Sequence, residues 1–276
     1  MVVQHNLTAM NANRNLGITT AKQAKQTEKL SSGYRINRAA DDAAGLSISE
    51  KMRRQIRGLD QASTNAQDGV SLVQVAEGAL NEVTDMLQRM NELTIKAANG
   101  TYTSTQRNYI ADEINQLISE VDRIATTTKF NDQLVLDGTF TSTKGRLQIG
   151  NESGETMTVS VGNMKASGIG VSDLGTSWSV ANGSVCDTFI NTVKNALEKV
   201  ASQRSALGAV QNRLEHTINN LDNIVENTTA AESRVRDTDM AKEMVTYSNN
   251  QILAQAGQAM LAQGNQVNQG VLSLLQ

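Results

Sequence analysis

Residues 46–98 read LSISEKMRRQIRGLDQASTNAQDGVSLVQVAEGALNEVTDMLQRMNELTIKAA and carry apolar residues that recur every seven positions. One row of this repeat consists of Met52, Leu59, Ala66, Val73, Leu80 and Leu87. An offset row consists of Ile48, Ala62, Ala76, Val83, Met90 and Ala97. A seven-residue apolar repeat is the seam of a helix that packs against other helices. The stretch therefore predicts one long helix, about 80 Å from end to end.

This helix also has apolar residues away from its seam, which favours contact with more than one neighbour. They are Val70, Leu72, Val75, Met86 and Ile95. Two glycines, Gly69 and Gly78, lower the helix propensity but allow a neighbouring segment to approach closely. The dipeptide Asn99-Gly100 ends the helix, because glycine readily adopts the left-handed conformation of a helix cap.

Two further helices are expected from the same kind of spacing. From about Ser104 onward, Ile110, Ile114, Leu117, Val121 and Ile124 are spaced by four and three residues. From Cys186 to about Asn227, Val193, Val200, Leu207, Leu214 and Leu221 lie seven apart. Three helices with matched seams can bury one another as an antiparallel bundle. Near the start of the third helix, Cys186 is expected to be a small buried apolar residue.

Residues 129–183 change character, with Gly, Ser, Thr and β-branched residues replacing the Ala, Gln and Glu of the helices. Apolar and polar residues alternate around Leu147 and Ile149 and again around Met157, Val159 and Val161. The turn-rich segment 150–155 separates the two alternating stretches, which indicates a β-hairpin. Residues 163–183 are predicted to be exposed loops.

Composition favours a mainly α fold in which long coiled-coil helices form an antiparallel bundle rod with a small β-hairpin region. The chain has no proline, and aromatic residues make up 3% of it. Without proline, helices can run long. Because aromatic side chains usually supply large blocks of core area, their scarcity suggests thin, extended cores.

Several classes of protein are poorly supported by the sequence. The net charge is −3 and no basic stripe interleaves with aromatic residues, which argues against nucleic-acid binding. No apolar run approaches the roughly 20 residues that span a bilayer, so no membrane partner is expected. The first residues, MVVQHNLTAM, lack the layout of a cleaved signal peptide. One cysteine cannot form an internal disulfide.

The two ends of the chain are apolar in helical spacing but uncharged. Residues 244–276 and 1–13 contain no Asp, Glu, Lys or Arg. The apolar positions, predicted to mediate polymerisation, are Val3, Leu7, Met10, Leu253, Ala256, Met260, Val267, Val271 and Leu274. Charges are depleted where burial would leave them unpaired, so these helices are expected to become buried on self-association. The alternative is a pair of disordered Gln/Asn-rich tails.

Several stretches of the sequence together carry the signature of one known family. Residues 30–50, LSSGYRINRAADDAAGLSISE, resemble the N-terminal signature of bacterial flagellins, and residues 205–213, SALGAVQNR, resemble the C-terminal bundle helix of the same family. The segments MAKEM (240–244), QILAQA (251–256) and VLSLL (271–275) resemble its terminal helix. The resemblance covers about residues 1–137 and 185–276.

The resemblance implies two domains. Residues 1–43 and 236–276 would pair their helices in an inner, channel-lining polymerisation domain. Residues 44–235 would form the bundle domain, with the hairpin and a short exposed loop region at about 129–183. The chain then looks like a short flagellin without large variable outer domains.

The resemblance also implies partners and a location. The chain would polymerise with itself into the extracellular flagellar filament after export through the flagellar type III machinery, without a cleaved signal peptide. An export chaperone would hold the C-terminal helix beforehand, and the filament cap and hook-junction proteins would contact the assembled subunits. Serine and threonine residues of the middle region are candidates for glycosylation.

Catalysis, a metal site and a bound cofactor are not expected. The two histidines, His5 and His216, are far apart and form no zinc-binding motif. The acidic pair Asp41-Asp42 and the run from Arg236 to Asp239 lack the spacing of a calcium loop. We expect these carboxylates to pair with Arg35, Arg38 or Arg53 and to mark a hinge between terminal and bundle helices.

One helix face is a candidate receptor-binding surface. Arg89, Leu93 and Lys96 are spaced by four and three, and they lie off the seam, so Leu93 is expected to be exposed. From these residues alone, an ordinary solvated helix face is the simpler interpretation. Residues 88–93 and 110–114, however, resemble the flagellin segments that animal Toll-like receptor 5 recognises. The resemblance implies Arg89, Leu93 and Glu113 as main contacts, with Gln88, Glu92 and Lys96 beside them.

Three other functions compete with a filament subunit. A hook–filament junction protein shares the terminal helices but forms a short ring. A chemoreceptor-type signalling coiled coil also has long Ala/Gln/Glu helices, but it needs membrane spans or an uninterrupted helical hairpin. An enzyme would need a constellation of catalytic residues, which the sequence lacks.

Overall fold

The computed structural model describes residues 6–140, 144–175 and 183–273, and it omits the side chains of residues 173, 175, 183–185 and 267–273. The chain divides into two compact units. Unit 1 comprises residues 1–56 and 227–276, and unit 2 comprises residues 57–226. Two long helices, α2 (Ala43–Ala98) and α5 (Gly183–Arg236), contribute to both units. The observed division cuts α2 at 56/57 and α5 at 226/227. The expected boundaries, 43/44 and 235/236, lie on the same two helices but nearer to their ends.

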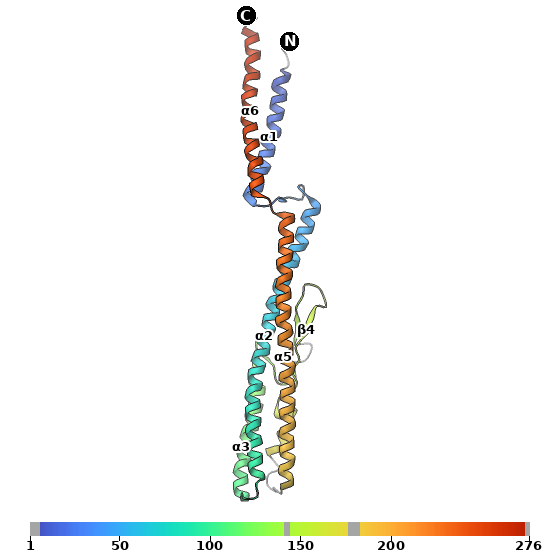
Figure 1. The fold of residues 1–276 in the computed structure, drawn as a ribbon, viewed down its shortest axis with the longest axis vertical. Helices are drawn as coiled ribbons and strands as arrows, with labels where there is room; N and C mark the ends of the chain where they lie inside the picture. Colours follow the sequence, from blue (N-terminus) through green and yellow to red (C-terminus); the bar gives the residue numbers. More distant parts are fainter. Residues whose placement is uncertain (1–5, 141–143, 176–182, 274–276) are drawn as a thin grey trace. The chain divides into compact units, whose positions relative to one another are not determined.

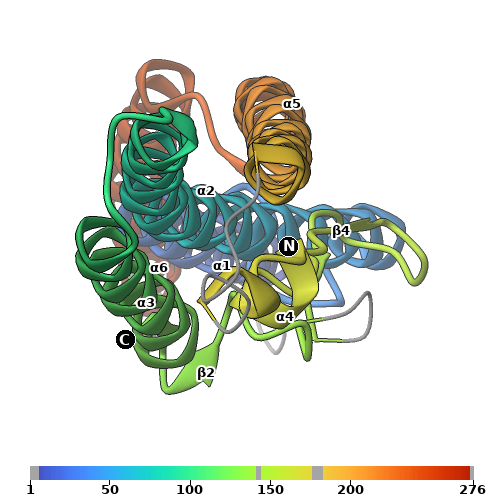
Figure 2. The same cartoon turned by 90° about the horizontal axis from the view of Figure 1, so that it is seen from below.

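Unit 2 is a three-helix bundle in which α3 (Ser104–Thr127) and the two long helices share one core. Figures 1 and 2 both show α2 between α3 and α5. The seam residues Val73, Leu80 and Leu87 are fully buried, as are Val193 and Val200 on α5. The heptad rows thus predicted correctly which faces of these helices are buried. The N-terminus of α3 is held by a capping box between Thr103 and Gln106.

Not every predicted seam position is buried. Ile48 is 49% exposed, and two off-seam residues, Val75 and Ile95, are also exposed. By contrast, off-seam Leu72 is buried. An α-helix repeats at 3.6 rather than 3.5 residues, and its neighbours change along its length, so the buried face drifts from a strict heptad row.

The predicted hairpin is present as β3 (Arg146–Gln148) and β4 (Thr156–Thr158), which pair antiparallel with Leu147 opposite Met157. A second hairpin, β1 (Lys129–Phe130) and β2 (Gln133–Leu134), was not expected. Its turn residues Asn131 and Asp132 have φ of 47° and 61°, as a two-residue hairpin turn requires.

The expectation that 163–183 is exposed loop is wrong for its described part. This segment forms α4 (Ala166–Ile169) and a short 3-10 helix, η1 (Ser172–Gly175). Met164, Ile169, Val171 and Leu174 are buried in the bundle core. The backbone N–H of Ala166 donates to Asp122 on α3 at 2.8 Å, which ties the segment to the bundle. Residues 176–182 lie outside the described residues.

The two glycines singled out on the long helix α2, Gly69 and Gly78, have different surroundings. A Cβ on Gly69 would meet the Leu147 side chain, so this glycine does permit the close approach of the β3–β4 hairpin. A Cβ on Gly78 would meet nothing within 4 Å, so close approach is not its role in the described residues. Cys186 is buried near the start of α5, as predicted.

Unit 1 pairs α1 (Leu7–Ser32) with α6 (Met240–Ser273). Figure 1 shows these two helices side by side. Helix α1 starts where the Asn6 side chain accepts the Ala9 N–H, and it ends at Gly33, whose φ of 76° is the left-handed cap conformation. The pairing of the terminal helices that the resemblance implied is therefore confirmed.

Candidate functional site

The seam between α1 and α6 is built from small and polar residues in heptad spacing. On α1 the partly buried positions in this spacing are Ala9, Ala12, Leu16, Thr19, Gln23, Gln26 and Leu30. On α6 they are Glu243, Tyr247, Asn250, Gly257, Leu261 and Gly264, with Ala254 buried. Each row alternates steps of three and four, so it follows the geometry of a coiled coil. The spacing of large apolar residues in the sequence does not reveal this seam, because few of the seam residues are large and apolar.

Contacts along the seam show that the helices run antiparallel. The Asn6 side chain donates to the Gly264 carbonyl at 3.0 Å, and the Asn250 side chain donates to Gln26 at 2.8 Å. Lys29 Nζ lies 3.9 Å from a Glu243 carboxylate oxygen. At the middle of the pair, a Cβ on Gly257 would touch Leu16 at 3.4 Å. The pair is thus joined by hydrogen bonds and close backbone approach more than by a large apolar core.

Most of the large apolar residues of the two helices face outward instead. Among the predicted polymerisation residues, Leu7, Met10, Leu253 and Met260 are between 57% and 66% exposed, and Ala256 is exposed as well. Val3 and Leu274 lie outside the described residues, and the side chains of Val267 and Val271 are not described.

Sequence reasoning missed several further members of this surface. Ile18, Met240, Met244, Val245 and Ile252 are exposed by between 46% and 64%. We name the exposed apolar residues of α1 and α6 the outward stripe: Leu7, Met10, Ile18, Met240, Met244, Val245, Ile252, Leu253, Ala256 and Met260. An exposed apolar surface of this kind marks an interaction site.

The segments that connect to α1 and α6 are held together around Arg236. Its guanidinium stacks on the Tyr34 ring at 4.7 Å, and its Nη1 pairs with Glu50 at 3.1 Å. The Arg35 backbone N–H donates to the Arg236 carbonyl at 2.7 Å, and the Thr238 N–H donates to the Gly33 carbonyl at 3.0 Å. These bonds fix the two connecting segments of unit 1 to each other.

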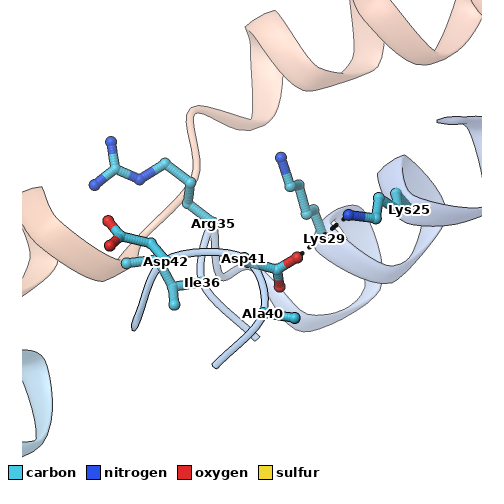
Figure 3. A pocket seen from close by; sticks show the side chains of 7 residues that line it. All are labelled: Lys25, Lys29, Arg35, Ile36, Ala40, Asp41 and Asp42. Carbon is cyan, nitrogen blue, oxygen red and sulfur yellow. Dashed lines mark ion pairs between the residues drawn. The ribbon is translucent and has the colours of Figure 1, made fainter. Parts of the chain in front are cut away.

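Asp41 and Asp42 have structural partners, but not those expected. The Asp41 carboxylate pairs with Lys25 at 3.5 Å, as Figure 3 shows, and Asp42 accepts the Gly45 N–H at the start of α2. Arg38 instead pairs with Glu28, and Arg53 with Glu50. The expected pairing of Asp41 and Asp42 with arginine side chains is therefore wrong, because the side chain that the fold brings against Asp41 is Lys25 of α1.

These acidic residues line a cavity of about 390 Å³ together with Lys25, Lys29, Arg35, Ile36 and Ala40. The backbone N–H of Arg38 and that of Asn37 donate to Asp41, and with Lys25 they hold the pKa of this carboxyl below its ordinary value. Because both carboxylates already have hydrogen-bond or ion-pair partners within the chain, we interpret the residues around this cavity as a structural connection between α1 and the start of α2.

The candidate receptor surface lies on unit 2, where α2 meets α3. Arg89 bridges the helices through Glu113, with Nη2 at 2.8 Å and Nε at 3.1 Å from the same carboxylate oxygen. Arg89 Nη1 also contacts Glu92 at 3.2 Å, and Lys96 lies over the Tyr102 ring at 5.8 Å. Arg89 and Glu113 are about half exposed, and Gln88, Glu92 and Lys96 are exposed.

The expectation that Leu93 is exposed is wrong. Leu93 is 2% exposed and belongs to the bundle core with Ile110 and Ile114. Helix α2 is covered on two sides here, so the buried arc is wider than the heptad seam and includes Leu93. The structure therefore brings Arg89 and Glu113 together at the surface but places Leu93 beneath them.

No cluster of metal-binding side chains is found among the side chains that the structure describes. Within the described ranges, and leaving aside Asp173, whose side chain is not described, no three His, Cys, Asp or Glu side chains gather as a metal site would require. Within the same residues, no helix combines the length and apolar character needed to cross a bilayer.

Known proteins match this chain over nearly its whole length. Residues 3–141 match the family model of the bacterial flagellin N-terminal helical region, and residues 190–275 match that of the C-terminal helical region. A flagellin of Halalkalibacterium halodurans is 52% identical, and the flagellar filament 31.3 kDa core protein of Treponema maltophilum is 50% identical, each over 100% of both chains. A solved structure of a flagellar hook-associated protein from Vibrio parahaemolyticus is similar in fold, with a TM-score of 0.58, 15% identity, and coverage of 71% of this chain and 100% of that one.

Proposed function

Because this chain belongs to the bacterial flagellin family, we propose that it is a structural subunit that polymerises with itself into the extracellular flagellar filament. The observation that carries the proposal is the outward stripe. Its large apolar side chains are between 46% and 66% exposed in the subunit, and the segment 244–276 has no Asp, Glu, Lys or Arg whose charge burial would leave unpaired. Flagellin is a family of structural proteins, so no catalytic role is assigned.

The physical argument is one of unsatisfied burial. Leu7, Leu253 and Ile252 each present most of their side chain to water in the single subunit. Burying an apolar side chain of this size stabilises an assembly by about 1.5–3 kcal/mol. Several such residues on each copy supply a driving force for association, and the partner we propose for them is another copy of the same chain.

Electron microscopy of the purified full-length chain, seeded with filament fragments, tests this proposal. We expect long tubular filaments. Polymers that stop as short oligomers would favour the alternative function, a hook–filament junction protein. The Vibrio hook-associated protein, 15% identical, shows that this fold also occurs in a protein of that kind. A chain that stays monomeric at high concentration would contradict both.

Family membership also supports finer proposals about the route to the filament. We propose export through the flagellar type III machinery without a cleaved signal peptide, with a chaperone on α6 beforehand, and contacts to the filament cap and hook-junction proteins after assembly. An exposed apolar helix such as α6 needs a cover in the cytoplasm, which supports the chaperone. The intact mass of the secreted chain tests for cleavage, and co-purification with and without residues 240–276 tests the chaperone.

A second proposed function is recognition by Toll-like receptor 5 of animals through the Arg89 surface. The Arg89–Glu113 pair, half exposed and bridging two helices, supports it, because arginine in a polar patch is a common binding hot spot. Gln88, Glu92 and Lys96 flank this pair. Leu93, being buried, contributes by supporting the helix beneath Arg89.

Binding of the receptor ectodomain to the unassembled subunit tests this second function. Arg89→Ala and Glu113→Ala should each weaken binding about tenfold or more without changing the thermal unfolding of the bundle. The matched control is Arg123→Ala, which removes another exposed ion pair, the one between Arg123 and Glu120 of α3. This variant should bind the receptor normally. Normal binding by both Arg89→Ala and Glu113→Ala would exclude this surface.

A further inference from the structure

Apart from Met52 on α2, which is partly buried, the methionines of the described residues separate into two groups by exposure. Met10, Met240, Met244 and Met260, all on α1 and α6, are 62%, 46%, 52% and 59% exposed. In unit 2, Met90, Met157 and Met164 are at most 7% exposed, and Met86 is partly buried. Accessible thioethers are the ones that peroxides oxidise, so the two groups differ in reactivity.

We propose that Met10, Met240, Met244 and Met260 form a modification site whose oxidation by peroxide blocks self-assembly of the subunit. The inference rests on the proposed function, since it takes the outward stripe to be buried between copies. These four side chains would then be accessible in the free subunit and shielded in the polymer.

The chemistry needs a peroxide and no other reactant. A lone pair of the methionine sulfur attacks one peroxide oxygen, an S–O bond forms, and the O–O bond breaks. The departing oxygen leaves as water after proton transfer from the transferred hydroxyl. The thioether is oxidised to a sulfoxide while the peroxide is reduced.

The consequence follows from where each sulfur lies. Met10 is about one helical turn from Leu7, Met240 and Met244 are one turn apart, and Met260 is seven residues, or two turns, beyond Leu253. A thioether adapts its shape to an apolar interface, whereas a sulfoxide is polar and must keep a hydrogen-bond partner. Burial of several sulfoxides among these apolar neighbours therefore opposes association.

Oxidation should leave the subunit itself folded. The α1–α6 seam runs through other residues, such as Leu16, Asn250 and Ala254, which contain no sulfur. In the bundle, Met90 and Met157 are shielded, and so is the thiol of Cys186. The modification thus acts on the assembly surface and not on the fold.

The test uses the full-length chain, treated as free subunits with dilute hydrogen peroxide and quenched with free methionine. Peptide mass mapping should find sulfoxide at the four exposed methionines well before Met90 or Met157. Circular dichroism should show unchanged helix content. The critical concentration for seeded assembly should rise about tenfold or more. Repair by the two methionine sulfoxide reductases, one for each sulfoxide epimer, should restore assembly.

A matched pair of variants identifies the sulfurs responsible. The variant Met10→Leu, Met240→Leu, Met244→Leu, Met260→Leu conserves volume, so it should assemble normally and keep its critical concentration after peroxide. The control Met86→Leu, Met90→Leu should lose assembly on oxidation like the unmodified chain. If the first variant assembles poorly even without peroxide, the reductase experiment on the unmodified chain still shows whether methionine oxidation causes the loss of assembly.

The outcomes separate this inference from the function on which it rests. Normal assembly of subunits carrying all four sulfoxides, or equal loss of assembly by the leucine variant, would overturn the inference while leaving the filament proposal intact. Failure of untreated subunits to assemble would overturn both. Oxidation at the same rate in filaments and in free subunits would also contradict it, because the stripe would then not be buried.

Discussion

In the bundle of unit 2, heptad spacing places large apolar residues such as Leu80, Leu87 and Val193 inside, where they are fully buried. In the α1–α6 pair, the same spacing places Ala9, Asn250 and Gly257 inside, while Leu7, Leu253 and other large residues point outward. Hydrophobic burial is the dominant favourable term in folding, so the bundle can be stable by itself. The pair, by contrast, leaves its main apolar surface for another copy of the chain.

The largest effect is expected where this difference is greatest. Leu7→Asp combined with Leu253→Asp would place two charges on the outward stripe, and burying them unpaired is costly. We expect the critical concentration for assembly to rise more than about a hundredfold, measured by sedimentation and electron microscopy. Thermal unfolding should be unchanged. The control Leu7→Met, Leu253→Met should assemble normally, and assembly by the charged variant would break the comparison.

Truncation of one leucine in each region gives the converse result. Leu87→Ala removes a fully buried side chain from the bundle and should lower the free energy of unfolding by about 2–5 kcal/mol in urea titrations followed by circular dichroism. Leu253→Ala, at an exposed site, should change it by less than about 0.5 kcal/mol. Similar losses for both would mean that the outward stripe stabilises the isolated subunit.

Two glycines on α2 sharpen the comparison within one helix. Gly78→Ala adds a methyl group to open space and improves helix propensity, so we expect a gain of about 0.5–1 kcal/mol. Gly69→Ala places its Cβ against Leu147 and 3.2 Å from Leu214, so overpacking should cost about 1–3 kcal/mol. Urea titration measures both, and effects of the same sign would contradict the packing of the β3–β4 hairpin on α2.

The smallest effect concerns acid and the Asp41 junction. The N–H groups of Arg38 and Asn37 and the cation of Lys25 hold the pKa of Asp41 below its ordinary value of 3.8. A carboxyl with a depressed pKa adds stability above its unfolded pKa, and this contribution is lost as the pH falls through the folded value. In thermal unfolding followed by circular dichroism, Asp41→Asn should therefore unfold at a slightly lower temperature than the unmodified chain at pH 7. The difference between the two unfolding temperatures should disappear in strong acid. An equal gap at both pH values would count against this role.

Within the bundle, much of the structure could be predicted from residue order. The rows through Leu80 and Met90 mark the core, and the alternation around Leu147 and Met157 predicts the β3–β4 hairpin. Helix α2 ends just before Asn99-Gly100, as predicted, but Gly100 does not have the positive φ of the left-handed cap expected there. These features depend on local periodicity and turn chemistry, which neighbouring residues along the chain determine.

Other features depend on partners that are remote in sequence. Leu93 is buried because α3 widens the covered arc of α2. Met164, Ile169 and Leu174 are buried because they pack on a core that helices from both halves of the chain create. Asp41 pairs with Lys25 because the connecting segment folds back onto α1. None of these contacts has a sequence period of its own.

The terminal helices show the division most clearly. By itself, the sequence determined that both ends are helical, apolar and uncharged, because helix periodicity and the absence of Asp, Glu, Lys and Arg can be read directly. Which face of each helix is turned to its partner was decided only by tertiary structure. Two apolar or small rows were available on α6, and close backbone approach at Gly257 and Gly264, with side-chain hydrogen bonds from Asn6 and Asn250, selected the row of small residues for the pair and left the row of large ones outside.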